Sequence, residues 1–249
     1  MTREHVFPRW LTGSPRFVNL TGEVKETRWW PAFTAPGSEK VLFESNAVDL
    51  EAKIVCEQCN TVWMRKLEDA AKRRMGPMIL GHKRILGRKD RIAIARWSMK
   101  TACVVRHCQD DVRAHVPLEL RRAVFRGGLP DNVFVWLGAI VPSGIDWGMY
   151  TTFISPPSRP LRFVGSEDTI RLGQLLIKGI TMNGPGDTRI GMTAQLLRCL
   201  IPLWPIRKRE PGYVWPPPAI VRPNGWTWFS QQLMQGGIKV DHPLLRSSN

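Results

Sequence analysis

Apolar residues recur at near-helical spacing over 61–74, and lysine and arginine fill most of the positions between them. This periodicity predicts a helix with one apolar face and one basic face, which Gly76 and Pro77 are expected to end. A second helix is predicted over 91–108, where the apolar residues again fall along one side. Asp90 has the side chain of a good N-cap for that second helix.

The pattern changes from helical to strand periodicity in the second half of the chain. A third helix is predicted over 117–125, because Pro117 suits the first helical position and Gly127 suits the stop. Beyond residue 130 the sequence is enriched in β-branched and aromatic residues, which favour strands. Strands are expected at 132–141, 148–155, 161–164 and 171–180. The Pro- and Trp-rich stretch from Pro202 onward is expected to be extended coil.

Prolines and glycines interrupt the first fifty residues and exclude a long helix there. Short strands are expected at 16–20 and 40–44, and another at 53–56, which enters a CEQC turn. These elements predict an α+β protein in which helices are followed by a mainly antiparallel sheet region. A boundary is expected near 76–88, where the pattern of elements changes. The predicted units are a small motif-bearing module over 1–80, and a basic helical segment with an α+β region over 81–249.

Hydrophobic residues make up 43% of the 249 residues, which is enough to bury a core. Four tryptophans lie in apolar patterns and are expected in that core: Trp10, Trp63, Trp97 and Trp136. No apolar run is long enough to predict a membrane span, and the start of the chain does not resemble a secretory signal. Five cysteines without a secretory context indicate reduced thiols. We therefore expect a cytoplasmic protein.

The net charge of +15 is unevenly distributed along the chain. Residues 1–71 carry nine Lys/Arg and ten Asp/Glu, whereas residues 72–126 carry fifteen Lys/Arg and only four Asp/Glu. Such a basic block favours a polyanionic partner, because lysine and arginine neutralise phosphates and release their counterions. Two alternatives to nucleic acid remain. The basic block could be a solvated surface without a specific ligand, or it could bind an acidic membrane surface.

Two fragments carry residue types that suit metal-dependent hydrolysis. The first is EHVFPRWL, which begins at Glu4, and the second is CEQCN, which begins at Cys56 and is followed by WMRKLE. An acidic residue and a histidine before an apolar residue and a proline, with a CxxC-Asn at the head of a helix, resemble the HNH endonucleases of bacteria and phages. The resemblance covers roughly residues 3–75. It implies that the N-terminal module is a small ββα-metal fold. It also implies that the cytoplasm is that of a bacterial or phage-infected host cell.

In this family reading, Glu4 and Asn60 would bind a catalytic divalent ion, Mg²⁺ or Mn²⁺, and His5 would be the general base. A single hydrolytic metal needs oxygen or nitrogen ligands and open positions for phosphate and water. A neutral imidazole beside it can deprotonate the attacking water. Basic residues after Asn60 would hold the backbone of the nucleic acid, which we expect to be DNA. They are Arg65, Lys66, Lys72, Arg73, Arg74, Lys83, Arg84, Arg88 and Lys89.

The resemblance also implies a structural zinc site at Cys56 and Cys59. Zinc takes four ligands, so this pair is half of a site. The helix over 91–108 could complete it with Cys103, His107 and Cys108, since residues four apart share a helix face. The alternatives are a reduced turn at the CxxC and a small core residue at Cys103. Cys199 is expected in the core.

Three functions remain open from the sequence. The first is an HNH-type endonuclease that hydrolyses phosphodiester bonds in DNA. The second is a nucleic-acid-binding protein on a degenerate HNH scaffold, because the middle asparagine and the upstream CxxC of the family have no clear counterpart. The third is a phage-type structural or interaction protein that binds another protein through its C-terminal region.

Overall fold

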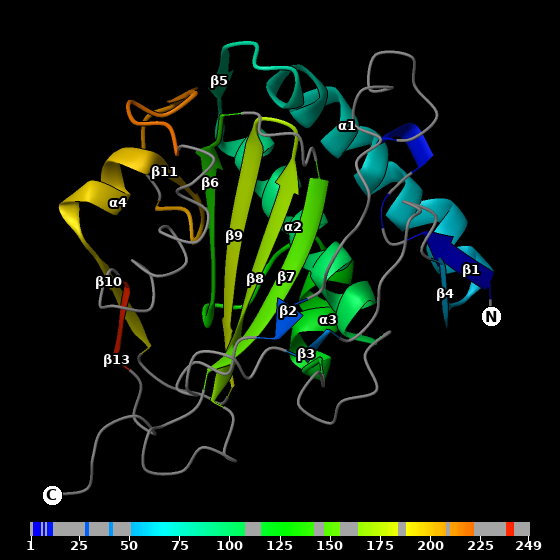
Figure 1. Cartoon of the computed structure of the whole chain (residues 1–249). Coiled ribbons are helices and arrows are strands. Elements are labelled where there is room, and N and C mark those ends of the chain that lie inside the picture. The colour runs from blue at the N-terminus through cyan, green and yellow to red at the C-terminus, as the bar shows by residue number, and fades with distance from the viewer. Residues whose placement is uncertain are drawn as a thin grey trace, which may run out of the picture.

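A computed structural model describes residues 2–5, 7, 9–11, 28–29, 40–41, 51–107, 116–141, 147–154, 164–183, 188–207, 210–221 and 238–241. Helices pack on a central antiparallel sheet (Figure 1), which confirms the predicted α+β class. The predicted strand at 16–20 lies outside the described residues. Of the strand predicted at 40–44, the structure describes only β3 (Lys40–Val41), which pairs with β2 (Arg28–Trp29).

Five antiparallel strands form the central sheet in the order β11-β6-β9-β8-β7 (Figure 1). Their bounds are β6 Val133–Ala139, β7 Trp147–Ile154, β8 Gly165–Leu172, β9 Leu175–Met182 and β11 Leu200–Trp204. The strands predicted at 132–141 and 148–155 are therefore confirmed as β6 and β7. Of the predicted 161–164 strand, only Val164 is described, and β8 begins just after it.

The single strand predicted over 171–180 is wrong, because this stretch contains the turn of a hairpin. Leu172 in β8 lies opposite Leu175 in β9, so the loop has two residues. Gly173 at its first position has a φ of 53°, a conformation that glycine adopts without a steric penalty. Arg171, Leu172, Leu175 and Leu176 gave the segment the pattern of one continuous strand.

The helices are α1 (Arg65–Ile79), α2 (Arg88–His107), α3 (Leu118–Arg126) and α4 (Ala194–Cys199). A π-helical turn, Cys59–Met64, leads into α1. The third predicted helix is confirmed as α3. Pro117 is its N-cap, and Gly127 follows it with a left-handed φ of 103°.

The prediction that Gly76 and Pro77 end the first helix is wrong, since α1 continues to Ile79 with Pro77 inside it. Proline lacks an N–H, so within a helix it leaves the carbonyl four residues earlier without its usual donor. Here that carbonyl belongs to Arg73, and the guanidinium of Arg84 donates to it at 3.2 Å. A side chain from the strand after the helix thus replaces the missing backbone donor.

Asp90 is not the N-cap of α2, because the helix begins two residues before it, at Arg88. The Asp90 carboxylate instead accepts a hydrogen bond at 3.0 Å from the backbone N–H of Gly87. This is the backward half of a capping box, in which the third helical residue reaches back to the N-cap position. The carboxylate also pairs with Arg74 at 2.8 Å, which joins α2 to α1.

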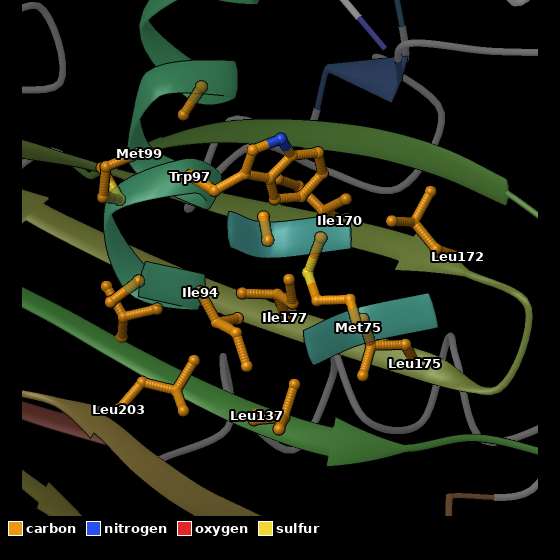
Figure 2. Close-up of a cluster of buried hydrophobic side chains, with 14 of the residues drawn as sticks. Met75, Ile94, Trp97, Met99, Leu137, Ile170, Leu172, Leu175, Ile177 and Leu203 are labelled. Atoms are coloured by element: carbon orange, nitrogen blue, oxygen red, sulfur yellow. The ribbon is translucent and has the colours of Figure 1, made fainter. Parts of the chain in front are cut away.

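The main hydrophobic core lies between the sheet and the helices α1 and α2. Met75 from α1 and Ile94 and Trp97 from α2 point onto the face formed by β6, β8 and β9, where Ile177 lies near the centre (Figure 2). Trp97 is fully buried, and Trp10 and Trp63 pack against the same cluster. A second cluster on the opposite face joins Trp136 to α4, so all four predicted core tryptophans pack in a core. Cys199 lies in this second cluster, as predicted.

The prediction of extended coil from Pro202 onward is wrong at three short strands, whereas residues 205–207, 210–212 and 216–220 lie outside helices and strands as predicted. Residues 200–204 form the edge strand β11, and β12 (Tyr213–Trp215) pairs with β5 (Arg84–Leu86). The short strand β13 (Ile238–Asp241) pairs with β10 (Arg189–Met192). Trp215 is fully buried, so the aromatic residues of this segment act as anchors in the core.

Candidate nuclease motif and nucleic-acid interface

Two strands that lie far apart in the sequence bring the two motif fragments together. β1 (Thr2–His5) pairs antiparallel with β4 (Glu51–Val55), so the Glu4-His5 dipeptide lies beside the strand that continues into CEQC. β4 confirms the strand predicted at 53–56. The pair lies at the end of α1 where the helical segment begins (Figure 1).

The register of β1 and β4 defines where His5 lies. His5 is opposite Glu51, at the start of β4, whereas Cys56 follows the other end of the strand. At about 3.3 Å per residue, these ends are separated by roughly 15 Å along β4. The helical segment that follows β4 must therefore run back along the strand pair if Asn60 and His5 are to share a site.

Both motif fragments contribute to the main hydrophobic core. Phe7 and Leu11 of EHVFPRWL are buried in it, and so are Met64 and Leu67 of WMRKLE. The two fragments are therefore anchored in one core as well as joined by strand pairing.

The CxxC begins the helical segment. The backbone N–H of Asn60 donates to the carbonyl of Cys56 at 3.0 Å, which closes the first helical turn. The N–H of Cys59 donates to Sγ of Cys56 at 3.4 Å. Asn60 itself lies in the π-helical turn, a rare geometry that is frequent at functional sites.

The two thiols of the CxxC have unequal acidity. Hydrogen bonds from Cys59, first from its backbone and then from its side chain, lower the pKa of the Cys56 thiol. The hydrogen bond to Cys56 raises the pKa of the Cys59 thiol. Cys56 is exposed, whereas Cys59 is partly buried against the core. Cys56 is therefore the more acidic thiol of the pair.

The metal sites implied by the resemblance are incomplete among the described side chains. No group of three or more His, Cys, Asp and Glu within them could hold a metal ion. Cys56 and Cys59 supply two of the four ligands that zinc needs. The side chains of Glu4 and Cys108 lie outside the described residues. Zinc thus lacks half of its ligand set in the described part of the chain.

Cys103 fits the core alternative rather than the zinc alternative. Burial raises the pKa of its thiol to about 12, so it stays protonated at neutral pH. Its neighbour His107 is exposed at the end of α2. A zinc-binding thiol must be deprotonated, which the surroundings of Cys103 oppose.

Seven of the nine predicted nucleic-acid-binding residues are exposed. They come from α1 and from the segment between α1 and the first turn of α2: Arg65, Lys66, Lys72, Arg73, Lys83, Arg88 and Lys89. None of the seven forms an ion pair within the described part of the chain. We refer to these seven side chains as the basic face. The two remaining residues, Arg74 and Arg84, instead lie near Asp90, at 2.8 and 3.9 Å.

Sequence reasoning missed a set of buried charges on and beside the sheet. The Arg106 guanidinium makes a bidentate ion pair with Asp168, and Thr151 donates to the same carboxylate at 2.9 Å. On the opposite face, Lys178 pairs with Glu167, and burial lowers the Lys178 pKa well below its usual value. The sequence signal that could have revealed these buried charges is the polar run Glu167-Asp168-Thr169, which lies inside a strand whose two faces are both covered.

A further buried lysine joins two helices. Lys100 of α2 is only 2% exposed and pairs with Glu68 of α1 at 2.8 Å. Glu68, the last residue of the WMRKLE fragment, is therefore an ion-pair partner that joins the two helices. The three buried pairs thus join α2 to the sheet, β9 to β8, and α2 to α1.

Comparisons of the chain with protein-family models, with curated proteins and with solved structures found no match. Within the described residues, no helix combines the length and the apolar character needed to cross a membrane.

Proposed function

We propose that this chain is a metal-dependent endonuclease of the HNH type, which hydrolyses phosphodiester bonds in DNA. The observation that carries the proposal is the pairing of β1 with β4, because it joins the Glu4-His5 strand to the strand that leads into CEQCN. The burial of Phe7, Leu11, Met64 and Leu67 in the same hydrophobic core supports the same arrangement.

Each residue of the proposed site has a distinct role. The Glu4 carboxylate and the Asn60 amide oxygen are hard donors of the type that Mg²⁺ and Mn²⁺ prefer, and they would hold the catalytic ion. Such an ion would neutralise charge on the scissile phosphate. His5 would remove the proton from the attacking water, for which a neutral imidazole is suited at physiological pH. We propose that this chemistry takes place in the cytoplasm.

The basic face would hold the DNA backbone. Its seven cations extend from the start of α1, beside the CxxC, to the first turn of α2. Lysine and arginine without internal partners are available to neutralise phosphates. A strand held along α1 would therefore approach the motif at the beginning of that helix.

The test is plasmid cleavage by the purified chain with Mg²⁺ or Mn²⁺, compared with His5→Ala. His107→Ala is the matched control, because it removes an exposed imidazole far along α2. We expect nicking or cutting by the wild type and the control, and at least about a hundredfold loss in His5→Ala, the usual contribution of a general base. Equal cleavage by all three proteins would exclude His5 as the base.

The second candidate function is nucleic-acid binding without cleavage, and the basic face favours it independently of the metal site. The logarithm of the binding constant for a DNA duplex should then fall linearly with the logarithm of the salt concentration. Replacing Lys72 and Arg73 with alanine should reduce that slope by roughly 0.9 for each phosphate that is no longer neutralised. Arg189→Ala, an exposed change in β10, is the control. Salt-dependent binding with no cleavage in any divalent ion would replace the nuclease proposal with this one.

A further inference from the structure

Cys56 and Cys59 lie one helical turn apart at the start of the helical segment. The hydrogen bond from the Asn60 N–H to the Cys56 carbonyl, at 3.0 Å, defines this turn. In a helical turn, Cα atoms three residues apart are separated by about 5 Å, as follows from the helical rise and radius. That separation lies within the range spanned by disulfides, roughly 4.4 to 6.8 Å. The backbone is therefore already arranged for a bond between the two sulfurs.

The two thiols also differ in the way that a two-step exchange requires. Cys56 is exposed, and its Sγ accepts the Cys59 N–H at 3.4 Å, a contact that holds the sulfur beside Cys59. Cys59 is partly buried, packs against the core and hydrogen-bonds to the Cys56 sulfur. One thiol is thus accessible to a reagent from solvent, and the other is held beside it.

We propose that Cys56 and Cys59 form a dithiol–disulfide redox site whose substrates are small-molecule disulfides. The Cys56 thiolate attacks one sulfur of the substrate, so that a mixed disulfide forms and one substrate thiolate leaves. Cys59 then gives its proton to solvent, and its sulfur attacks Cys56, which displaces the second substrate thiolate. The protein dithiol loses two electrons and becomes a disulfide, and the substrate disulfide gains them and becomes two thiols.

The surroundings of two other cysteines make this exchange selective. Burial raises the pKa of both Cys103 and Cys199, so their thiols stay protonated at neutral pH. Thiolates rather than thiols attack disulfides, and access to the sulfur limits the rate as well. The site does not depend on the proposed nuclease, because neither step uses the residues assigned to hydrolysis.

The test uses the full-length reduced chain and dithiobis(nitrobenzoic acid), an aromatic disulfide that releases coloured thionitrobenzoate. In a Cys108→Ser chain, whose remaining cysteines all lie within the described residues, we expect at neutral pH a fast release of two thionitrobenzoates per chain. Peptide mapping by mass spectrometry should then find a Cys56–Cys59 disulfide. Cys59→Ser should release one and retain a mixed disulfide at Cys56. Cys56→Ser should slow the fast phase on the order of tenfold or more. Cys103→Ser should leave it unchanged.

Three results would overturn the proposal. The first is a fast phase that survives in Cys56→Ser. The second is a wild-type mixed disulfide that Cys59 does not resolve. The third is stoichiometric zinc in the purified chain that protects both thiols until a chelator removes it, since this would make the CxxC part of a metal site. Circular dichroism of each variant shows that a lost reaction is not a loss of fold. These results do not depend on whether His5→Ala abolishes plasmid cleavage, so the redox proposal and the nuclease proposal can be refuted independently.

Discussion

Replacing Asp168 with asparagine should destabilise the protein strongly. The side chain keeps its shape but loses its charge, so the Arg106 guanidinium, at 2% exposure, is left buried without a counter-charge. The carboxylate also accepts from Thr151 at 2.9 Å, which makes the site a network of three side chains. Removing one partner of a buried ion pair costs about 3–5 kcal/mol.

The measurement is the free energy of unfolding in urea, followed by tryptophan fluorescence. For a chain of this size, a loss of about 3–5 kcal/mol corresponds to a fall in Tm of roughly 6–20 °C. Thr151→Val is the matched control, because it removes one neutral donor and should cost only about 1 kcal/mol. The double variant Asp168→Leu/Arg106→Met should recover most of the loss, since apolar residues can replace a buried pair at little cost. A loss below about 1 kcal/mol in Asp168→Asn would refute the reasoning that the pair is buried and tightly coupled.

Three further predictions concern local features of the fold. Arg84→Met should lower the unfolding free energy by about 1 kcal/mol, because it removes the donor to the Arg73 carbonyl, which Pro77 leaves without a helical partner. In a Pro77→Ala background the same substitution should cost nothing, because the helix then supplies the donor. Gly165→Ala should lower the unfolding free energy by about 1–3 kcal/mol in the same assay, since its Cβ would lie 2.6 Å from the Thr181 carbonyl oxygen. Gly128→Ala is the control and should cost far less, because a Cβ there meets nothing within 4 Å. Cys103 should resist iodoacetamide at pH 8 in the folded protein and react in urea, because with a pKa of about 12 only on the order of one thiol in ten thousand is ionised. Since this folded pKa lies above the unfolded value, the contribution of the thiol to stability is complete below pH 9 and is lost as the pH rises toward 12. Fast alkylation of this partly buried thiol at pH 8 would contradict its raised pKa.

The predictions that succeeded rest on local signals. The third helix was predicted correctly because Pro117 and Gly127 mark both of its ends, and those signals act within a few residues of the helix. The strands at 133–139 and 147–154 were recognised from their β-branched and aromatic residues. In each case the information lies in the segment itself.

The predictions that failed depend on contacts between distant segments. Pro77 ends a helix unless another donor satisfies the freed carbonyl, and that donor is Arg84, in the strand after the helix. The segment 200–215 lacks strand periodicity, yet it forms β11 and β12 because the sheet edge and β5 offer unpaired backbone groups. No pattern within either segment reveals these partners.

The candidate site also has a part that local sequence signals predict and a part that depends on contacts between distant segments. The motif residues Glu4, His5, Cys56 and Asn60 could be chosen from residue types and order alone. The pairing of β1 with β4, across a separation of nearly fifty residues, could not, because spacing does not reveal which strands meet. The lowered pKa of Cys56 depends on the first helical turn, which closes only when that segment folds.

Three residues of the segment from β11 to β12 contact Arg91 at the start of α2, and these contacts set when α2 can reach its final environment during translation. Arg91 is 1% exposed, and its guanidinium donates to the Pro202 carbonyl, pairs with Glu210 and lies over the Tyr213 ring. All three partners are synthesised more than a hundred residues after Arg91. During translation this charge therefore stays in water until residue 213 has left the ribosome, and the first turns of α2 reach their final environment late. A fragment that ends before residue 200 would expose the Arg91 cation and the edge of β5, so α2, β5 and the segment from β11 to β12 form one cooperative unit.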